Sequence, residues 1–204
     1  MIPDQTVDPH RGVQTGIPTG AAPVRGRLFL VVGPSGVGKD TLLAGAVLAD
    51  PRLHWARRLI TRPESAGAEP FEGVTEAVFR TRLLGGDLAL HWRAHGLSYG
   101  VTRAELAPTG QGRDVLLNGS RGAIAQALAS FPDLKILHIT APLPVLAQRL
   151  ADRGREALPE VQARLARATL ALPADLPANL SVTRIVNDAS PELGVARLLQ
   201  ALRA

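Results

Sequence analysis

The chain has 204 residues with a formal net charge of +5, and it contains no cysteine, which excludes disulfides and thiolate metal sites. It has no apolar run of about 18 residues, so we expect no transmembrane helix. Aromatic residues make up only 3%, so leucine, valine and alanine must fill the core. This length and composition fit one α/β domain of a soluble, cytoplasmic protein.

The positive charge is compatible with nucleic-acid binding, but so few aromatic side chains offer little base stacking. We favour arginines that converge on anionic small molecules. The expected partners are therefore small molecules, with no nucleic acid and no membrane, and the sequence leaves the oligomeric state open.

The first predicted elements follow a segment without hydrophobic periodicity. Residues 1–26 are rich in proline, glycine and threonine and predict a disordered leader, and residues 27–204 form one folded domain. The strands expected in its first half are Leu28–Val32, Trp55–Thr61, Leu88–Ala94 and Leu97–Val101. The helix after the first strand is expected to end at Ala49. A second helix is expected from the N-cap Thr75 to Leu84, with a loop at Pro63–Gly73 between the two helices.

The second half of the chain continues the alternation of strands and helices. The expected strands are Asp114–Leu117, Leu134–Thr140 and Ser181–Val186. The expected helices are Ala123–Ser130, Pro142–Arg153, Pro159–Leu172 and Pro191–Leu202. This alternation indicates a parallel sheet covered by helices on both faces, in which ligands bind beyond the carboxyl ends of the strands.

A glycine-rich loop joins the first predicted strand to the first helix. Backbone N–H groups of such a loop and the helix N-terminus surround a polyphosphate, and a lysine reaches its terminal phosphates. Asp40 stands where the Mg²⁺-binding serine or threonine of a P-loop is expected. The loop reads Gly33, Pro34, Ser35, Gly36, Val37, Gly38, Lys39, Asp40 and Thr41.

Two arginine-rich segments suggest contacts with further phosphates. Arg62 lies at the carboxyl end of the second predicted strand, where an arginine fork would face an acceptor phosphate. Arg149 and Arg153 share one helix face beside Gly154, and with the arginines that follow they predict a mobile lid. The alternative for both segments is a solvated basic surface.

Four short segments resemble the guanylate-kinase-like group of P-loop kinases over about residues 27–203. They are Thr61-Arg62, the run from His95 to Gly100 with Tyr99, the run from Arg149 to Gly154, and Val186-Asn187-Asp188. The resemblance implies a three-layer α/β fold with a parallel sheet, a small acceptor-binding insertion and an arginine-rich lid. It also implies that Asn187 lies near the base of ATP.

The acceptor pocket departs from that group at the positions that would recognise guanine. Leu90 and Val101 replace a glutamate and a hydroxyl residue, and Ser65 replaces a second arginine. A purine facing Leu90 would leave polar groups unpaired, at a cost of about 1 kcal/mol or more for each group. We therefore expect GMP to be a poor acceptor.

These departures resemble the ribose 1,5-bisphosphate phosphokinases of phosphonate utilisation. The shared segments are the Gly-Lys-Asp form of the P-loop, Arg57–Pro63, His91–Gly100 and Asn118–Arg121. The implied reaction transfers the γ-phosphoryl group of ATP to the 1-phosphate of ribose 1,5-bisphosphate and yields 5-phosphoribosyl 1-diphosphate. Pro70-Phe71 departs from the polar Asn-His pair of that family.

The resemblance and the motifs together assign a role to each candidate residue. Lys39, Arg62, Arg149 and Arg153 are the expected catalytic residues, and ATP is bound by residues 33–41 and Asn187. Mg²⁺ is expected to accompany ATP, held by Asp40 and Thr41. The expected acceptor-binding residues are Arg58, Arg62, Tyr99, Asn118, Ser120 and Arg121.

Two other functions remain open from the sequence. One is a guanylate-type nucleoside monophosphate kinase, against which Leu90 and Val101 argue. The other is a guanylate-kinase-like module that binds a partner without catalysis, against which the intact glycines and Lys39 argue.

Overall fold

The computed structural model describes residues 25–64, 69–152, 165, 166, 168 and 171–204. Nearly all of the leader expected at residues 1–26 lies outside the described residues. So do Arg153 and most of the helix expected at Pro159–Leu172. Among the described residues, no helix is both long and apolar enough to cross a membrane.

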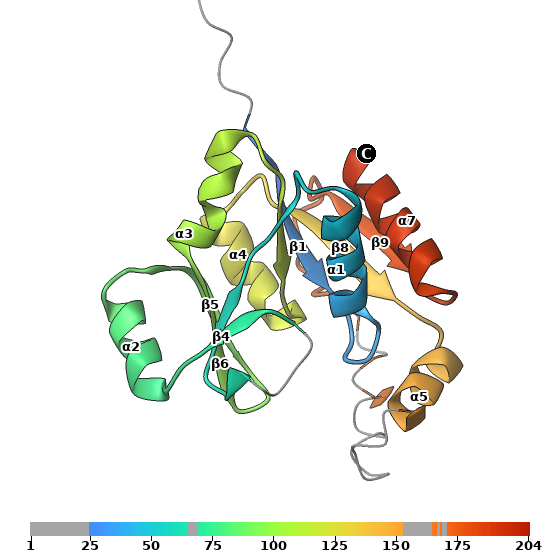
Figure 1. The fold of residues 1–204 in the computed structure, drawn as a ribbon, viewed down its shortest axis with the longest axis horizontal. Helices are drawn as coiled ribbons and strands as arrows, with labels where there is room; N and C mark the ends of the chain where they lie inside the picture. The colour runs from blue at the N-terminus through green and yellow to red at the C-terminus, as the bar shows by residue number, and fades with distance from the viewer. Residues whose placement is uncertain (1–24, 65–68, 153–164, 167, 169–170) are drawn as a thin grey trace, which may run out of the picture.

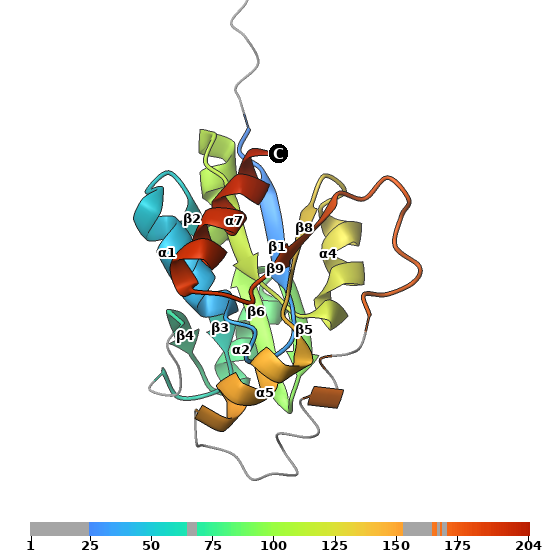
Figure 2. The ribbon, with the colours of Figure 1, turned by 90° about the vertical axis from the view of Figure 1, so that its right-hand side faces the viewer.

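A five-stranded parallel sheet forms the centre of the molecule, with the strand order β2-β7-β1-β8-β9. Helices cover both of its faces, α1 and α7 on one side and α4 on the other (Figure 2). The three-layer α/β fold predicted from the sequence is therefore confirmed. The elements are β1 (Leu28–Val32), β2 (His54–Trp55), β7 (Val115–Asn118), β8 (Lys135–Thr140), β9 (Val182–Val186), α1 (Lys39–Ala49), α4 (Ile124–Ser130) and α7 (Pro191–Arg203).

The central strand β1 explains how one sheet serves two helical layers. Successive side chains of a strand point to opposite faces. Phe29 and Val31 belong to the core beneath α1 and α7, whereas Leu30 and Val32 belong to the core beneath α4. All four are buried, so the strand reads as a continuous apolar run, as buried parallel strands do.

A second sheet, with the order β4-β3-β6-β5, lies to one side together with α2 (Figure 1). The β5–β6 hairpin turns at His95 and Gly96, which both have positive φ angles of 52° and 75°, as a tight hairpin turn requires. The hydroxyl of Thr75 accepts a hydrogen bond from the Val78 N–H and caps α2 as expected. The elements are β3 (Arg58–Ile60), β4 (Phe71–Gly73), β5 (Leu88–Ala94), β6 (Leu97–Thr102) and α2 (Glu76–Leu84).

The remaining elements connect the two sheets or follow the main one. These elements are α3 (Arg103–Leu106), η2 (Ala107–Gln111), η3 (Arg121–Ala123) and α5 (Leu143–Asp152). The sequence predicted α5, but it did not predict the two short helices after β6, α3 and η2.

The single strand predicted at Trp55–Thr61 is wrong. Its first part, β2, pairs with β7 in the main sheet, and its second part, β3, pairs with β4 and β6 in the other sheet. The carboxylate of Glu105 accepts hydrogen bonds from His54 Nε2 (2.8 Å) and the Arg57 N–H (2.9 Å). Because a side chain satisfies the Arg57 N–H, the chain can leave one sheet and enter the other.

The loop predicted at Pro63–Gly73 is also partly wrong, because Phe71–Gly73 forms β4. This strand pairs in parallel with β3, and Arg58 lies opposite Phe71. Three residues of strand within a segment containing glycine and proline leave no recognisable alternation in the sequence.

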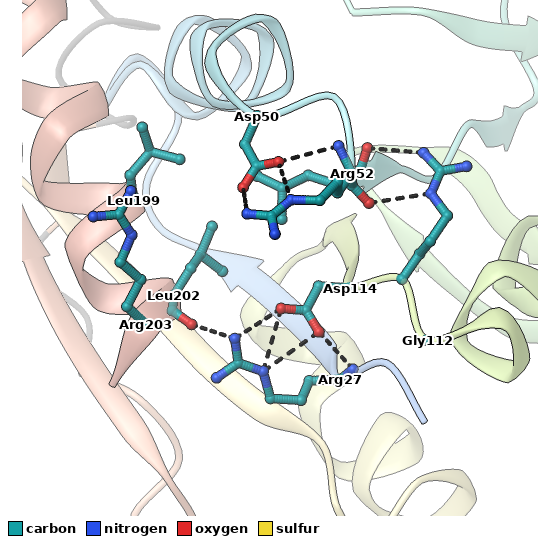
Figure 3. A pocket seen from close by; sticks show the side chains of 10 residues that line it. Arg27, Asp50, Arg52, Gly112, Asp114, Leu199, Leu202 and Arg203 are labelled. Carbon is teal, nitrogen blue, oxygen red and sulfur yellow. Dashed lines mark hydrogen bonds and ion pairs between the residues drawn. The ribbon is translucent and has the colours of Figure 1, made fainter. Parts of the chain in front are cut away.

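Paired charges surround a cavity of about 240 Å³ at the end of the main sheet where β1 and β7 begin (Figure 3). Arg27 forms a salt bridge with Asp114 (2.7 Å) and donates to the Leu202 carbonyl, and Arg52 pairs with Asp50 (2.8 Å). Arg113 donates to three carbonyl oxygens of residues 51–53. These arginines satisfy carboxylates and chain carbonyls, so we assign this end a structural role.

Candidate active site

A cavity of about 250 Å³ lies at the other end of the main sheet, between the P-loop and the second sheet. Its position follows the rule that ligands of parallel sheets bind beyond the carboxyl ends of the strands. It brings together most of the site residues predicted from the sequence. Those that line it are Gly33, Ser35, Gly36, Gly38, Lys39, Asp40, Thr41, Arg58, Arg62, Tyr99, Asn118 and Ser120.

The P-loop turns tightly between β1 and α1. Gly36 and Gly38 have φ angles of 84° and 93°, which side chains rarely adopt. Lys39 Nζ donates hydrogen bonds to the carbonyl oxygens of Gly33 (2.9 Å) and Pro34 (3.0 Å). The ammonium group therefore lies within the curl of the loop, where the phosphates of a nucleotide are expected.

Burial lowers the pKa of Lys39 to about 8, and the nearby carboxylate of Asp40 opposes this shift. The positive charges of Arg58 and Arg121 lower the same pKa further. The Glu69 carboxylate, like that of Asp40, raises this pKa, so it is mainly burial that leaves the ammonium group short of stabilising negative charge. A polyphosphate would supply that charge and favour the protonated lysine.

Asn187 and Arg149 donate hydrogen bonds to the backbone of the P-loop. Asn187 Nδ2 donates to the Val37 carbonyl oxygen (2.7 Å), and a Cβ atom on Gly38 would lie 2.7 Å from this nitrogen. Arg149 Nη1 donates to the Asn187 carbonyl oxygen (3.0 Å) and, at 3.4 Å, to that of Val37. Both residues thus lie beside the nucleotide loop, in contact with its backbone.

A chain of hydrogen bonds crosses the floor of the cavity. Asn118 Nδ2 donates to Asp40 Oδ1 (2.8 Å) and to Glu69 Oε2 (3.1 Å). Glu69 also accepts two hydrogen bonds from Arg58, from Nε at 2.6 Å and from Nη2. The contacts join the P-loop helix to the second sheet. They also occupy Arg58 and the Asn118 amide group, which the sequence analysis assigned to the acceptor.

Glu69 is the functional candidate that the sequence analysis missed. Its side chain is only 3% exposed, yet it lines the cavity. Burial raises its pKa, against the lowering by the hydrogen bonds and charge of Arg58. The sequence signal was weak, because Glu69 is one of three glutamates within the predicted loop Pro63–Gly73. Its partner Arg58 lies in the preceding strand, so only the β3–β4 pairing reveals the contact.

Arg62 and Tyr99, both predicted to bind the acceptor, are positioned by aromatic packing. The guanidinium of Arg62 lies 4.5 Å from the centre of the Phe71 ring, and its buried Nε has no hydrogen-bond partner among the described residues. The Tyr99 ring stacks on Trp92 at 5.3 Å with 6° between the planes. Phe71, which departs from the family pattern, thus supports the arginine predicted to bind the acceptor.

The other predicted residues lie around this centre. Ser120 lines the cavity at the end of β7. Arg121 is close enough for its charge to act on Lys39, and burial lowers the pKa of Arg121 itself. Of the two arginines predicted for the lid, Arg149 lies in α5 and Arg153 lies outside the described residues.

Comparisons with known proteins agree with this architecture. A guanylate kinase from Anaplasma phagocytophilum superposes with a TM-score of 0.63 at 18% identity, covering 88% of this chain and 86% of that one. At such low identity the likeness concerns the fold. Together with the P-loop and the cavity beside it, this likeness defines the P-loop kinase fold in its guanylate-kinase-like form.

Sequence relatives narrow this class to one family. A ribose 1,5-bisphosphate phosphokinase of Ruegeria sp. strain TM1040 is 48% identical over 161 residues, 78% of this chain and 84% of the relative. The chain belongs to the ribose 1,5-bisphosphate phosphokinase family. It is also 44% identical to a bifunctional ribose 1,5-bisphosphokinase-thymidine phosphorylase of Cupriavidus necator. That match covers 87% of this chain and 29% of the relative. A scan against models of protein families gives no match.

Proposed function

We propose that the protein transfers the γ-phosphoryl group of ATP to the 1-phosphate of ribose 1,5-bisphosphate. A new bond forms between an oxygen of the 1-phosphate and the γ-phosphorus, and the bond to the β,γ-bridging oxygen breaks. The products are 5-phosphoribosyl 1-diphosphate and ADP. Family membership supports this acceptor, and the burial of two apolar side chains supports it further.

These side chains are at the two positions at which the resemblance to guanylate kinases would place the groups that recognise guanine. Leu90 and Val101 are 1% and 0% exposed and belong to the apolar core with Trp92 and Tyr99. A nucleobase placed there would lose its hydrogen bonds to water without gaining partners. An acceptor made of a sugar and two phosphates avoids this penalty.

The residues of the cavity suit phosphoryl transfer, in which catalysis rests on positioning and electrostatics. Lys39 would bind the terminal phosphates of ATP, and Arg62 the acceptor phosphate beside them. Arg149, and Arg153 in the lid, would neutralise charge on the transferring group. The acceptor oxygen is already anionic, so the reaction needs no general base.

The oxygen groups near Asp40 are compatible with Mg²⁺. Magnesium prefers oxygen ligands and usually keeps several waters, with one or two carboxylates and the substrate phosphates. Among the described residues there is no cluster of three or more histidine, cysteine or acidic side chains that would form an all-protein metal cage. We assign Asp40 and Thr41 as the residues that would hold the metal, which would neutralise charge on the bound phosphates when present.

The function is tested by measuring ADP release from MgATP with three acceptors in parallel. Ribose 1,5-bisphosphate should be turned over, and GMP and ribose 5-phosphate should give no more ADP than MgATP alone. Turnover of GMP would instead mean that the pocket recognises a base. Loss of turnover with all three, with ATP still bound, would favour a binding module.

A further inference from the structure

Glu69 occupies an unusual place for a carboxylate, the floor of a cavity built to hold phosphates. Its side chain is 3% exposed, and Asp40, a second carboxylate, shares the Asn118 amide nitrogen with it. Two negative groups so close to each other and to anionic substrates oppose substrate binding. Because a carboxylate here opposes substrate binding, we expect Glu69 to have a role that a neutral residue could not fill.

The contacts of Glu69 identify that role. Its two oxygens receive Arg58 Nε and Nη2, which fixes the guanidinium in one plane 5.1 Å from the centre of the Tyr99 ring. One of these oxygens also accepts the Asn118 amide, whose nitrogen holds Asp40. Glu69 therefore contacts the acceptor side directly and the nucleotide side through a single residue.

We propose that Glu69 is a positioning residue for phosphoryl transfer, which holds Arg58 on the acceptor side and, through the Asn118 amide, Asp40 on the nucleotide side. The inference rests on the proposed function. It assigns the alignment of the two substrates to a residue that lies just before β4, in the connection from β3.

The orientation of the Asn118 amide supports the link between Glu69 and Asp40. The residue is 2% exposed at the end of β7, and its Oδ1 has no hydrogen-bond partner among the described residues. The two carboxylates fix the amide with its nitrogen toward them. Without the charge of Glu69 the amide could rotate to satisfy its oxygen, and Asp40 would lose its donor.

The test compares Glu69→Gln with Glu72→Gln in the full-length protein. Glu72 lies in β4, three residues after Glu69, and pairs with Arg82 at 2.6 Å, and it does not line the cavity. Mn²⁺ affinity is measured by electron paramagnetic resonance in the presence of a non-hydrolysable ATP analogue, and kcat and KM are measured with ribose 1,5-bisphosphate. Circular dichroism confirms that each variant is folded at the assay temperature.

Glu69→Gln should weaken Mn²⁺ binding and lower kcat, each by about tenfold or more, as for residues that orient metal ligands. Glu72→Gln should change neither. Unchanged Mn²⁺ affinity in Glu69→Gln would overturn the proposal, even if the acceptor KM rises. Failure of the proposed function would look different, because the wild-type protein would then not use the bisphosphate.

The double variant Arg58→Met/Glu69→Met separates positioning from simple charge neutralisation. If Glu69 only offsets the charge of Arg58, removal of both side chains should restore Mn²⁺ affinity, and the proposal fails. If Glu69 orients Asn118 and Asp40, the double variant should keep the weakened Mn²⁺ affinity of Glu69→Gln.

Discussion

The guanidinium of Arg62 lies 4.5 Å from the centre of the Phe71 ring, which supports it from beneath. An arginine on an aromatic face keeps its planar fork available for a phosphate. The phenylalanine that departs from the family pattern thus has a defined contact with the arginine that we propose binds the acceptor.

Replacing Phe71 with leucine should raise the acceptor KM by about twofold to thirtyfold, because a cation–π contact contributes about 0.5 to 2 kcal/mol. The KM for ATP should stay unchanged. Phe79→Leu, in the separate core around Leu59 and Leu88, is the matched control, and it should lower stability without changing the acceptor KM. Equal effects of both substitutions on the acceptor KM would mean that Phe71 acts only through stability.

Replacing Arg62 with alanine should lower kcat/KM for the acceptor by about 100- to 1,000-fold, since it removes a preorganised donor to the transferring phosphates. Arg62→Lys should recover only part of this loss, because an ammonium group lacks the bidentate fork. Steady-state kinetics at saturating MgATP measure both variants. A loss of less than about tenfold for Arg62→Ala would remove the residue from the site.

Replacing Asp40 with asparagine should raise the Mg²⁺ concentration needed for half-maximal turnover by about tenfold or more. The amide can still contact Asn118, but it no longer offers a carboxylate to the metal. Asp50→Asn is the control, because this residue follows the other end of α1 and pairs with Arg52. An unchanged Mg²⁺ requirement in Asp40→Asn would contradict the assignment of the metal ligand.

His138 should make the free energy of unfolding depend on pH. Burial, with the charges of Arg121 and Arg184, lowers the pKa of His138 below its ordinary value of 6.5. The unfolded chain therefore binds a proton at pH values where the folded protein does not. Stability should rise with pH from the lowered pKa up to about 6.5, and it is lost as the pH falls through this range.

The variant His138→Gln should remove this contribution. Urea unfolding at about pH 7.5 and about pH 5 should show a smaller acid-induced loss in the variant than in the wild type. If the two proteins lose the same free energy of unfolding over this range, His138 does not carry the effect.

The local parts of this site could be predicted from the sequence. Gly36 and Gly38 adopt the left-handed conformations that a P-loop requires, and Lys39 follows them at a fixed spacing on the same turn. The His95–Gly96 hairpin was predictable for the same reason, because its turn chemistry lies in adjacent residues.

The contacts between distant segments could not be predicted. Arg58 was assigned to the acceptor because it belongs to the arginine-rich segment Arg57–Pro63 that resembles the family. Its contact with Glu69 is visible only once β3 and β4 pair in parallel. The break of the chain between β2 and β3 depends on Glu105, which lies 48 residues beyond Arg57. No local pattern encodes a hydrogen bond across such a separation.

The most direct test of the central claim identifies the product formed from MgATP and ribose 1,5-bisphosphate. Phosphorus NMR of the reaction should show a diphosphate at carbon 1 of the ribose, an unchanged 5-phosphate, and ADP in equal amount. A product phosphorylated elsewhere, or ADP formation with GMP but not with the bisphosphate, would contradict the account.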